Sequence, residues 1–463
     1  MVTVRHPVRS ARSLAERLRA LERQTGELQS AVRQIQGQVA RTADAALVAE
    51  VRDSLHLAVR ATAFRRRRAR VLFLVHLIEA WDSSQELYEL MAAADDFEPV
   101  VASIPRHFPG DATSTFETEV HRALSERGVP HLRLAASEPG DTLRLVKAIE
   151  PDIIFRQSQW DADIADELGA HRISFARTCL VPYETMNIVQ NVPDAHTSNS
   201  AVDSAFHRDA WAVFCANDIM ASMASADGAR GGQQFHVTGH PKADMLRNVH
   251  PRWPVDSDGR RHRIAWSAHH SIATGWSDFG MFPSLAEPML AWATDARDTE
   301  FVFLAHPALQ PFSASPNSPL SRADYDAWLD RWRSLPNTAV GRPGEYPATL
   351  AASDLLITDG LSMLVEFQLF ERPLIFVERR EHRPFNEIGE LVRRGVHGVT
   401  SVKDVRELAE KLLANGSDPL QPIQQANVSK LFGPPGAAER ILTVLRTLIA
   451  EEVRSSSTSA LAG

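Results

Sequence analysis

The chain has 463 residues, 44% apolar and 23% charged, which is enough for two globular domains and a further segment. A net charge of -8 at pH 7 gives no reason to expect a nucleic-acid partner. The two cysteines, Cys179 and Cys215, have no second cysteine or histidine at metal-ligand spacing, which favours a reducing cytoplasm. No long apolar run and no signal-peptide pattern is present, so we expect a soluble or peripheral protein.

Residues 1–64 are predicted to form a coiled-coil helix. From residue 14, apolar side chains recur at alternating spacings of four and three for about four heptads, interrupted only at Thr25, with Arg, Glu and Gln between them. The seam consists of Leu14, Leu18, Leu21, Leu28, Val32, Ile35 and Val39. We therefore expect a homo-oligomer formed through residues 14–58. The alternative, which we consider second, is a long helix that packs on its own domain.

Consecutive arginines, Arg65 to Arg68, and then Arg70 separate this helix from the first predicted strand. Each arginine near an anionic membrane surface contributes about 1 kcal/mol of attraction, so the cluster could hold the protein at lipid headgroups. A solvated hinge is the other interpretation, because no amphipathic aromatic stretch accompanies the arginines. We place the protein in the cytoplasm and leave peripheral contact with the inner face of the cell membrane open.

Residues 65–250 alternate short β-branched or aromatic runs with helical stretches, which is typical of parallel βαβ units. The predicted strands are Val71–Val75, Glu98–Ser103, His131–Leu134, Ile153–Phe155, Arg172–Phe175, Trp211–Cys215 and Gln234–Thr238. Together they predict one Rossmann-like domain of ordinary size.

A polar linker is predicted from Asn248 to Arg263, and residues 251–452 then repeat the alternation. The second set of strands is Arg263–Trp266, Phe301–Leu304, Ala339–Val340, Leu355–Ile357 and Leu374–Val377. Two Rossmann-like domains facing across a cleft form an α/β fold of GT-B type, with the donor nucleotide in the second domain and the acceptor approaching from the first. Residues 453–463 are small and polar and are predicted to be disordered.

The segment around Asp359 carries the clearest chemistry, because a buried strand is predicted to enter a helix there. Thr358 or Asp359 supplies a cap, Gly360 permits a tight turn, and Ser362 lies in the first helical turn. Free amides and the helix dipole at such a place suit a pyrophosphate. Glu366 lies one turn further on the same face, where it could accept from ribose hydroxyls or order a cationic partner. An ordinary capped helix is the alternative, and it would not need Ser362 and Glu366 together.

This segment resembles the CDP-glycerol glycerophosphotransferase family, which comprises the teichoic-acid polymerases and their capsule-making relatives. The family pattern is roughly I-T-D-Y-S-S-x-x-F-D-x-x-x-x-x-x-P-x-I-F. The chain keeps Ile357, Thr358, Asp359, Ser362, Pro373, Ile375 and Phe376. It departs from the pattern at Gly360 and Leu361, where the family shows Tyr-Ser, and at Glu366, which stands near the family's Asp.

Four further segments are similar to the same family and follow in the expected order. They are Val237 to Asp244 (V-T-G-x-P-x-x-D), Ile264 to Ile272 with its double histidine, Phe303 to Pro307 (F-x-x-H-P) and Gly436 to Ile441, which is one residue shorter than the family's G-x-x-x-x-R-I. The resemblance covers residues 71 to 447 and is strong from residue 237 onward.

The resemblance implies contacts to a donor diphosphate from His306, Ser362 and Arg440. Transfer of a phospho-alditol from CDP requires stabilisation of negative charge on the leaving cytidylate and on the group in flight. His269 and His270, at the end of a neighbouring strand, are suited to this catalytic task. Each residue alone also fits a turn, an ion pair or the surface, but their shared position at strand ends favours a site.

The acceptor side offers a weaker pattern, because the Trp-His-Gly that supplies the favoured general base in the family's polymerases is absent. His76 is the candidate catalytic base, with Glu79 beside it in the predicted first β-to-α loop, since either group could take a proton from an acceptor hydroxyl. Asp82 in the same loop is interpreted as the cap of the next helix, because two serines follow it.

The sequence therefore predicts a transferase without metal or cofactor. It would move glycerol phosphate or a related phospho-polyol from a CDP-linked donor to a hydroxyl of a cell-surface glycan or lipid-linked precursor. No Asp-x-Asp lies near the donor motif, and the glycine-rich motifs of kinase-like and dinucleotide enzymes are missing. Two alternatives stay open: a GT-B glycosyltransferase that uses a nucleotide sugar, and a catalytically degenerate coiled-coil scaffold for surface-polysaccharide assembly.

Overall fold

The computed structural model describes residues 68–106, 117–135, 140–190, 199–255, 262–275, 277–342 and 344–461, together with Leu47, Val51 and Leu55. The predicted coiled coil and the arginines before Arg68 lie outside these residues, except that Leu47, Val51 and Leu55 are helical and exposed. Self-association through residues 14–58 and membrane contact by the arginine run therefore stay predictions.

The first domain is built on a seven-stranded parallel sheet with the strand order β3-β2-β1-β4-β5-β6-β7. Its strands are β1 Ala69–Val75, β2 Phe97–Ser103, β3 Leu132–Arg133, β4 Ile153–Arg156, β5 Arg177–Leu180, β6 Ala212–Cys215 and β7 Phe235–Val237. The order reverses between β1 and β4, so the crevice in which such sheets bind ligands opens at the carboxyl ends of these two strands.

Short helices connect these strands. They are η1 Ile78–Ser83, α2 Gln85–Ala93, α3 Glu117–Glu126, α4 Asp141–Ile149, η2 Asp161–Asp163, η3 Asp166–Leu168, α5 Ala170–Ile173, α6 Ala205–Asp209, α7 Asp218–Asp227 and α8 Pro241–Asn248. The strand predicted at Arg172–Phe175 is wrong, because α5 occupies its first half and β5 begins only at Arg177. Ala170 and Ile173, which are three residues apart, are both buried, and this is helical rather than strand spacing.

The second domain repeats the plan with a six-stranded parallel sheet of order β10-β9-β8-β11-β12-β13. Its strands are β8 His262–Ala268, β9 Thr299–Ala305, β10 Thr338–Val340, β11 Leu355–Thr358, β12 Leu374–Val377 and β13 His397–Val399. Here the order reverses between β8 and β11, and the segment predicted to carry the chemistry follows β11 directly. Only the short β13 was not predicted from the sequence.

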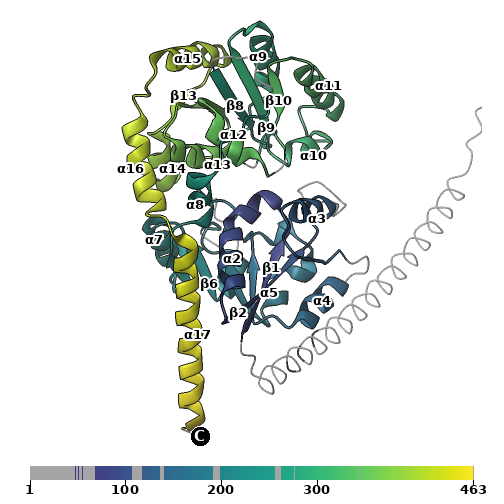
Figure 1. Cartoon of the computed structure of the whole chain (residues 1–463), viewed down its shortest axis with the longest axis vertical. Coiled ribbons are helices and arrows are strands. Elements are labelled where there is room, and N and C mark those ends of the chain that lie inside the picture. The colour runs from purple at the N-terminus through teal and green to yellow at the C-terminus, as the bar shows by residue number, and fades with distance from the viewer. Residues whose placement is uncertain are drawn as a thin grey trace, which may run out of the picture. The chain divides into compact units, whose positions relative to one another are not determined.

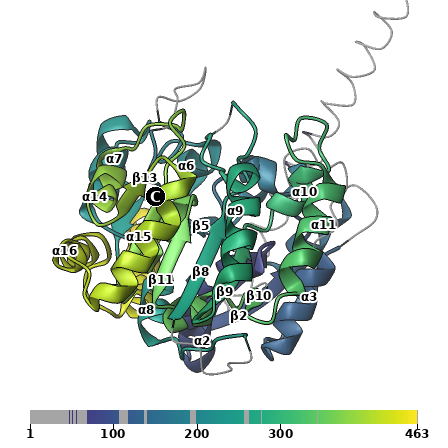
Figure 2. The same cartoon turned by 90° about the horizontal axis from the view of Figure 1, so that it is seen from above.

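Helices bury both faces of this second sheet. They are α9 Phe282–Asp295, α10 Leu309–Ser313, α11 Arg322–Arg333, α12 Tyr346–Ala352, α13 Leu361–Glu366, η4 Phe367–Phe370, α14 Glu387–Arg393, α15 Val402–Asn415 and α16 Gln421–Phe432. On one face α9 and α11 lie side by side (Figure 2), and Trp266 of β8 packs against Phe282 and Trp328 from these helices. Side chains that point to the opposite face, such as Leu356 of β11 and Phe376 of β12, enter the core on that face.

The last helix, α17 Ala437–Leu461, returns to the first domain. Its residues Ala438, Ile441 and Leu445 are buried in one cluster with Phe73 of β1, and Figure 1 shows α17 beside α2. The sequence had assigned this helix to the second domain and had left residues 453–463 disordered, whereas the helix completes the first core and continues to Leu461. None of the described helices is long and apolar enough to cross a membrane.

Candidate functional site

The candidate donor site lies at the reversal point of the second sheet, where β8 and β11 end next to each other. The register pairs Thr358 with Ser267, which places Asp359 level with the residues that leave β8. The Asp359 carboxylate accepts the backbone N–H of His269 at 2.6 Å and that of Met281 at 2.5 Å. Asp359 therefore ties the loop after β8 to the turn after β11, at the position where open α/β sheets bind their ligands.

Asp359 itself is fully enclosed, so it positions the site and has no surface to offer a ligand. Burial raises the pKa of this carboxyl to about 7, against the opposing effect of the two backbone donors. Gly360 follows with an ordinary extended φ of -99°, so the turn does not require a left-handed residue. A side chain at Gly360 would instead meet Thr358 Oγ1 at 3.3 Å and the His269 ring at 3.9 Å, and the close approach of these groups explains the glycine. Ser362 lies partly exposed in the first turn of α13.

Three histidines gather at this point, and two of them come from the loop after β8. The ring centroids of His269 and His270 are 4.5 Å apart, those of His269 and His306 are 5.3 Å apart, and those of His270 and His306 are 4.2 Å apart. Burial lowers the pKa of all three, and the charge of Arg106 lowers it further for His270, to about 4, and for His306. All three rings are therefore neutral at pH 7.

Backbone contacts fix which nitrogen carries the proton in two of these rings. The Nδ1 of His306 accepts the N–H of Ala308 at 3.1 Å, and the Nδ1 of His269 accepts the N–H of Ser271 at 3.3 Å. The Ser271 hydroxyl, which accepts the N–H of Phe279, lies 2.7 Å from the same nitrogen of His269 and can donate to it. A neutral imidazole has one N–H, so these contacts assign the proton of both rings to Nε2. His269 and His306 thus offer two Nε2–H donors from neighbouring strand ends.

The positions of these ring protons also bear on whether the three histidines could bind a metal ion. Ligand nitrogens of the three histidines lie within 4.8 Å of one another, which is close enough to consider a shared cation. A metal ion needs a lone pair from each ring, but in His269 and His306 the Nδ1 lone pair already accepts a backbone proton and Nε2 carries the ring proton. This donor set fits an oxyanion better than it fits a cation.

On the first domain, His76 lies at the corresponding reversal point, after β1. The side chain of Gln157, which follows β4, accepts the backbone N–H groups of His76 and Leu77 at 3.0 and 3.1 Å and donates to the Leu77 carbonyl. Burial, followed by the charges of Arg106 and Arg156, lowers the pKa of His76 well below its usual value, so the ring is neutral. Its Nε2 has no hydrogen-bond partner among the described residues.

Several groups near this loop were not found from the sequence. Burial raises the pKa of Glu79, which the sequence had named as a possible base, and also the pKa of Asp163 after β4 and of Glu184 after β5. The charge of Arg106, which follows β2, acts on Glu79 and Asp163 in the first domain as well as on two donor-site histidines in the second. The available signal was position in a segment that follows a strand, since these residues lie after β1, β2, β4 and β5.

Asp82 does not cap α2, contrary to the prediction. The N-cap of α2 is Ser84, and no side chain caps it. The Asp82 carboxylate instead accepts from Arg127 at 2.8 Å, and Arg127 also donates to the Gly344 carbonyl of the second domain at 3.2 Å. Asp82 is therefore held at the domain boundary.

Glu366 is fully buried at the same boundary and is not grouped with the histidines. One carboxylate oxygen lies 2.7 Å from the Lys242 ammonium of α8, and the other accepts the Tyr346 hydroxyl at 2.9 Å. The Lys242 ammonium also lies 5.4 Å from the centre of the Tyr346 ring. Of the two roles considered for Glu366, ordering a cationic partner is the one observed, and that partner belongs to the first domain.

The guanidinium of Arg440, near the start of α17, binds backbone carbonyls. Its nitrogens donate to the carbonyls of Thr238 at 2.7 Å and of Pro434 and Pro435 at 2.8 Å each. Asp244 accepts the backbone N–H groups of Gly436 and Ala437 there. The family-like segments at 237–244 and 436–441 therefore contact each other, and the observed partners of Arg440 belong to this junction, not to the histidine site.

Comparisons with known proteins were made by family, sequence and structure. A scan of protein-family models gave no match, and a search of the curated proteins gave none either. Solved structures do match over most of the chain. The UDP complex of MnaA from S. aureus is 14% identical with a TM-score of 0.56, and the match covers 82% of this chain and 97% of that one.

Two further solved structures illustrate the range of neighbours. The UDP-GlcNAc 2-epimerase from Neisseria meningitidis bound to UDP-GlcNAc is 12% identical with a TM-score of 0.55, covering 82% of this chain and 100% of that one. The wall teichoic acid polymerase TagF, as a variant soaked with CDPG, is 12% identical with a TM-score of 0.53, covering 88% and 99%. At such identities the likeness shows the fold alone: two parallel-sheet α/β domains in a GT-B-like arrangement.

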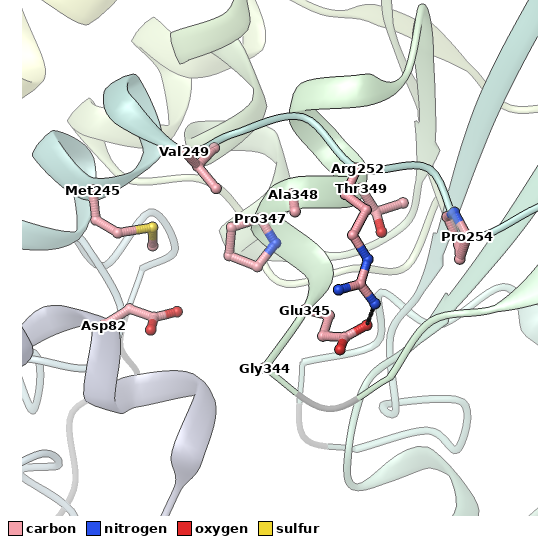
Figure 3. Close-up of a pocket in the computed structure, with 10 residues that line it drawn as sticks. All are labelled: Asp82, Met245, Val249, Arg252, Pro254, Gly344, Glu345, Pro347, Ala348 and Thr349. Atoms are coloured by element: carbon pink, nitrogen blue, oxygen red, sulfur yellow. Dashed lines mark hydrogen bonds and ion pairs between the residues drawn. The ribbon is translucent and has the colours of Figure 1, made fainter. Parts of the chain in front are cut away.

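A cavity of about 200 Å³ opens at the domain boundary, apart from the histidines (Figure 3). Asp82 of η1 forms one side, Met245 and Val249 at the end of α8 form another, and Pro347 and Ala348 of α12 close it. None of the three histidines lines it. The cavity and the histidine cluster are therefore separate features of the described structure.

Proposed function

We propose that the protein is a metal-independent transferase that moves glycerol phosphate or a related phospho-polyol from a CDP-linked donor. The acceptor is a hydroxyl of a cell-surface glycan or its lipid-linked precursor. The observation that carries the proposal is the pair of neutral Nε2–H donors, His269 and His306, at the reversal point of the second sheet. The family-like motifs around these residues support CDP as the nucleotide, as does the fold shared with TagF, whose structure was soaked with CDPG.

This donor set suits a diphosphate. Phosphoryl transfer requires little covalent chemistry from the protein and relies on positioning and on stabilising negative charge. His269 and His306 supply donors without changing their own charge, His270 packs against both rings, and the charge of Arg106 reaches this group from the first domain. Ser362 adds a hydroxyl at the turn after β11. Donor contacts by Glu366 and Arg440 stay predictions.

His76 is the proposed general base on the acceptor side. Its Nε2 is enclosed and has no hydrogen-bond partner among the described residues, so it is the nitrogen that would take the proton of an acceptor hydroxyl brought against this loop. The neutral state that burial enforces is the state a base needs. An anionic phosphate bound nearby would raise the pKa of the ring, because it favours the imidazolium that forms when the hydroxyl is deprotonated.

A glycosyltransferase acting on a nucleotide sugar is the second candidate. Two observations favour it: neighbouring structures contain UDP or UDP-GlcNAc, and Gly360-Leu361 replaces the Tyr-Ser of the polymerase pattern. Such an enzyme would use the same diphosphate site but would leave both phosphates on the nucleotide.

The donor site is tested by titrating CDP and UDP into the full-length protein by calorimetry. The double variant His306→Ala, Ser362→Ala should bind CDP at least about tenfold more weakly, since a hydrogen bond to a charged group contributes about 1.5–3 kcal/mol. The matched control is His250→Ala, Ser334→Ala, which changes the same residue types at exposed positions and should bind like wild type. Equal CDP affinity in wild type and the site variant would refute the assignment, and tighter binding of UDP than of CDP would favour the second candidate.

A further inference from the structure

The cavity beside Asp82 has a buried carboxylate oxygen on its wall. Asp82 is only 7% exposed, its Oδ1 is paired with Arg127, and its Oδ2 has no partner among the described residues. Figure 3 shows this carboxylate turned toward Pro347 and Gly344 across the cavity. Buried polar atoms are nearly always hydrogen-bonded, so the unpaired Oδ2 of a residue that lines the cavity can take a hydrogen bond from a molecule bound there.

The charges around the cavity are already balanced. Asp82 is paired with Arg127, and Glu345 at the rim is paired with Arg252 at 3.0 Å. The charges of Glu366 and Lys242, which also act on Asp82, form a pair of their own. A charged ligand would add a charge for which these pairs leave no unpaired counterion, which is unfavourable. The ligand that fits is therefore neutral and donates a hydrogen bond.

Size and wall chemistry narrow the class further. A volume of about 200 Å³ is smaller than the roughly 300–1,000 Å³ of sites for drug-sized ligands, so a nucleotide does not fit. Met245, Val249, Pro347 and Ala348 provide apolar walls, while Asp82, Glu345, Arg252 and Thr349 provide the polar groups of the lining. A polyol combines hydroxyl donors with C–H faces and matches both surfaces.

We propose that this cavity binds a neutral polyol, either a small alditol or the terminal ring of a glycan, whose hydroxyl donates to Asp82 Oδ2. Its C–H faces pack against Met245, Val249 and Pro347. Because Asp82 belongs to the first domain and Pro347 to the second, the bound polyol contacts both domains and favours the arrangement in which they meet. The binding site does not depend on the identity of the donor nucleotide.

The site is tested by saturation-transfer NMR on the full-length protein with glycerol, xylitol and maltotriose as probes. At least one probe should bind saturably to wild type. Ala348→Leu, which fills the cavity without touching Asp82, should weaken that binding at least tenfold, and Asp82→Asn should weaken it at least fivefold. Ala327→Leu, the same change at an exposed position of α11, should leave the affinity unchanged.

Three results would overturn the proposal. They are the absence of saturable binding by any probe, an affinity in Ala348→Leu within twofold of wild type, and tighter binding of the cation ethanolamine than of the polyols. Tighter binding of maltotriose than of glycerol supports the site and assigns it to a glycan end, whereas the reverse order supports it and assigns it to a free alditol. The CDP titration addresses a separate site, so each experiment can fail alone.

Discussion

Arg106 is the residue that connects the two halves of the proposed active site. It is 7% exposed in the loop after β2, and its positive charge lowers the pKa of His76 on the acceptor side and of His270 and His306 on the donor side. The histidines supply neutral donors, whereas the guanidinium supplies positive charge. A diphosphate bound between them would interact with both kinds of group.

Replacing this charge should change the titration of the histidines. In Arg106→Gln we expect the pKa of both His270 and His306 to rise, because a nearby cation disfavours the imidazolium and its removal relieves that effect. For His270 the titration midpoint should move up from about 4 toward the usual value, although burial still holds it below that value. Histidine NMR across pH 3 to 8 measures this, with Arg333→Gln at an exposed position as the control. Unchanged midpoints in Arg106→Gln would show that the guanidinium does not face these rings.

For individual residues, the sequence predicted which side chains lie at strand ends but not which groups they contact. His269, His270 and His306 could be grouped in advance, because parallel strands bring their carboxyl ends to one edge, and the structure places these rings together. Glu366 meets Lys242, which depends on how the two domains pack, and Arg440 meets the Thr238 carbonyl, which depends on the return of the last helix to the first domain. Arg106 was missed because its loop carries no motif. Its role becomes visible only when folding brings it near histidines that are distant in sequence.

Helix α13 is tied to α8 by a buried ion pair, which links the donor-site turn to the first domain. Glu366 at the end of α13 is 0% exposed, and Lys242 at the start of α8 is nearly as buried. Removing one member of such a pair leaves an uncompensated buried charge, whereas replacing both with neutral groups of similar shape is often tolerated. The pair is therefore a positioning device whose loss should depend on which partner changes.

Lys242→Met should reduce the free energy of unfolding by about 3–5 kcal/mol, the usual cost of leaving a buried charge unpaired. The double variant Lys242→Met, Glu366→Gln should recover much of this loss. Urea unfolding monitored by circular dichroism measures both, and Arg331→Met, which breaks the exposed pair with Glu287, should change little. A double variant less stable than Lys242→Met would contradict this account of the pair.

Among the secondary-structure elements, strongly apolar strands were predictable and marginal ones were not. The core strands of both sheets follow from β-branched and aromatic runs, but β13 has only three residues, and Arg172–Phe175 proved to be partly helical. The sequence predicted that α17 is a helix, but it did not predict that this helix packs against the first domain. Periodicity indicates which face of a helix is buried, and only the folded chain shows that the first sheet buries it.

On the scale of the whole molecule, the two domains use one plan for different tasks. Each sheet reverses its order once, and a side chain fixes the loops at each reversal: Gln157 in the first domain and Asp359 in the second. Alternating strands and helices were sufficient to predict this GT-B-like architecture. They were not sufficient to identify the donor, because related folds bind UDP-sugars as well as CDPG.

The central claim is transfer of a phospho-polyol from a CDP-linked donor, and product mass tests it most directly. The full-length protein is incubated with a panel containing CDP-glycerol and UDP-sugars together with a cell-surface glycan acceptor, and products are analysed by mass spectrometry. The account predicts release of CMP and an acceptor that gains one glycerol phosphate, with loss of both in His306→Ala. Consumption of a UDP-sugar, with release of UDP and gain of a sugar without phosphate, would contradict it.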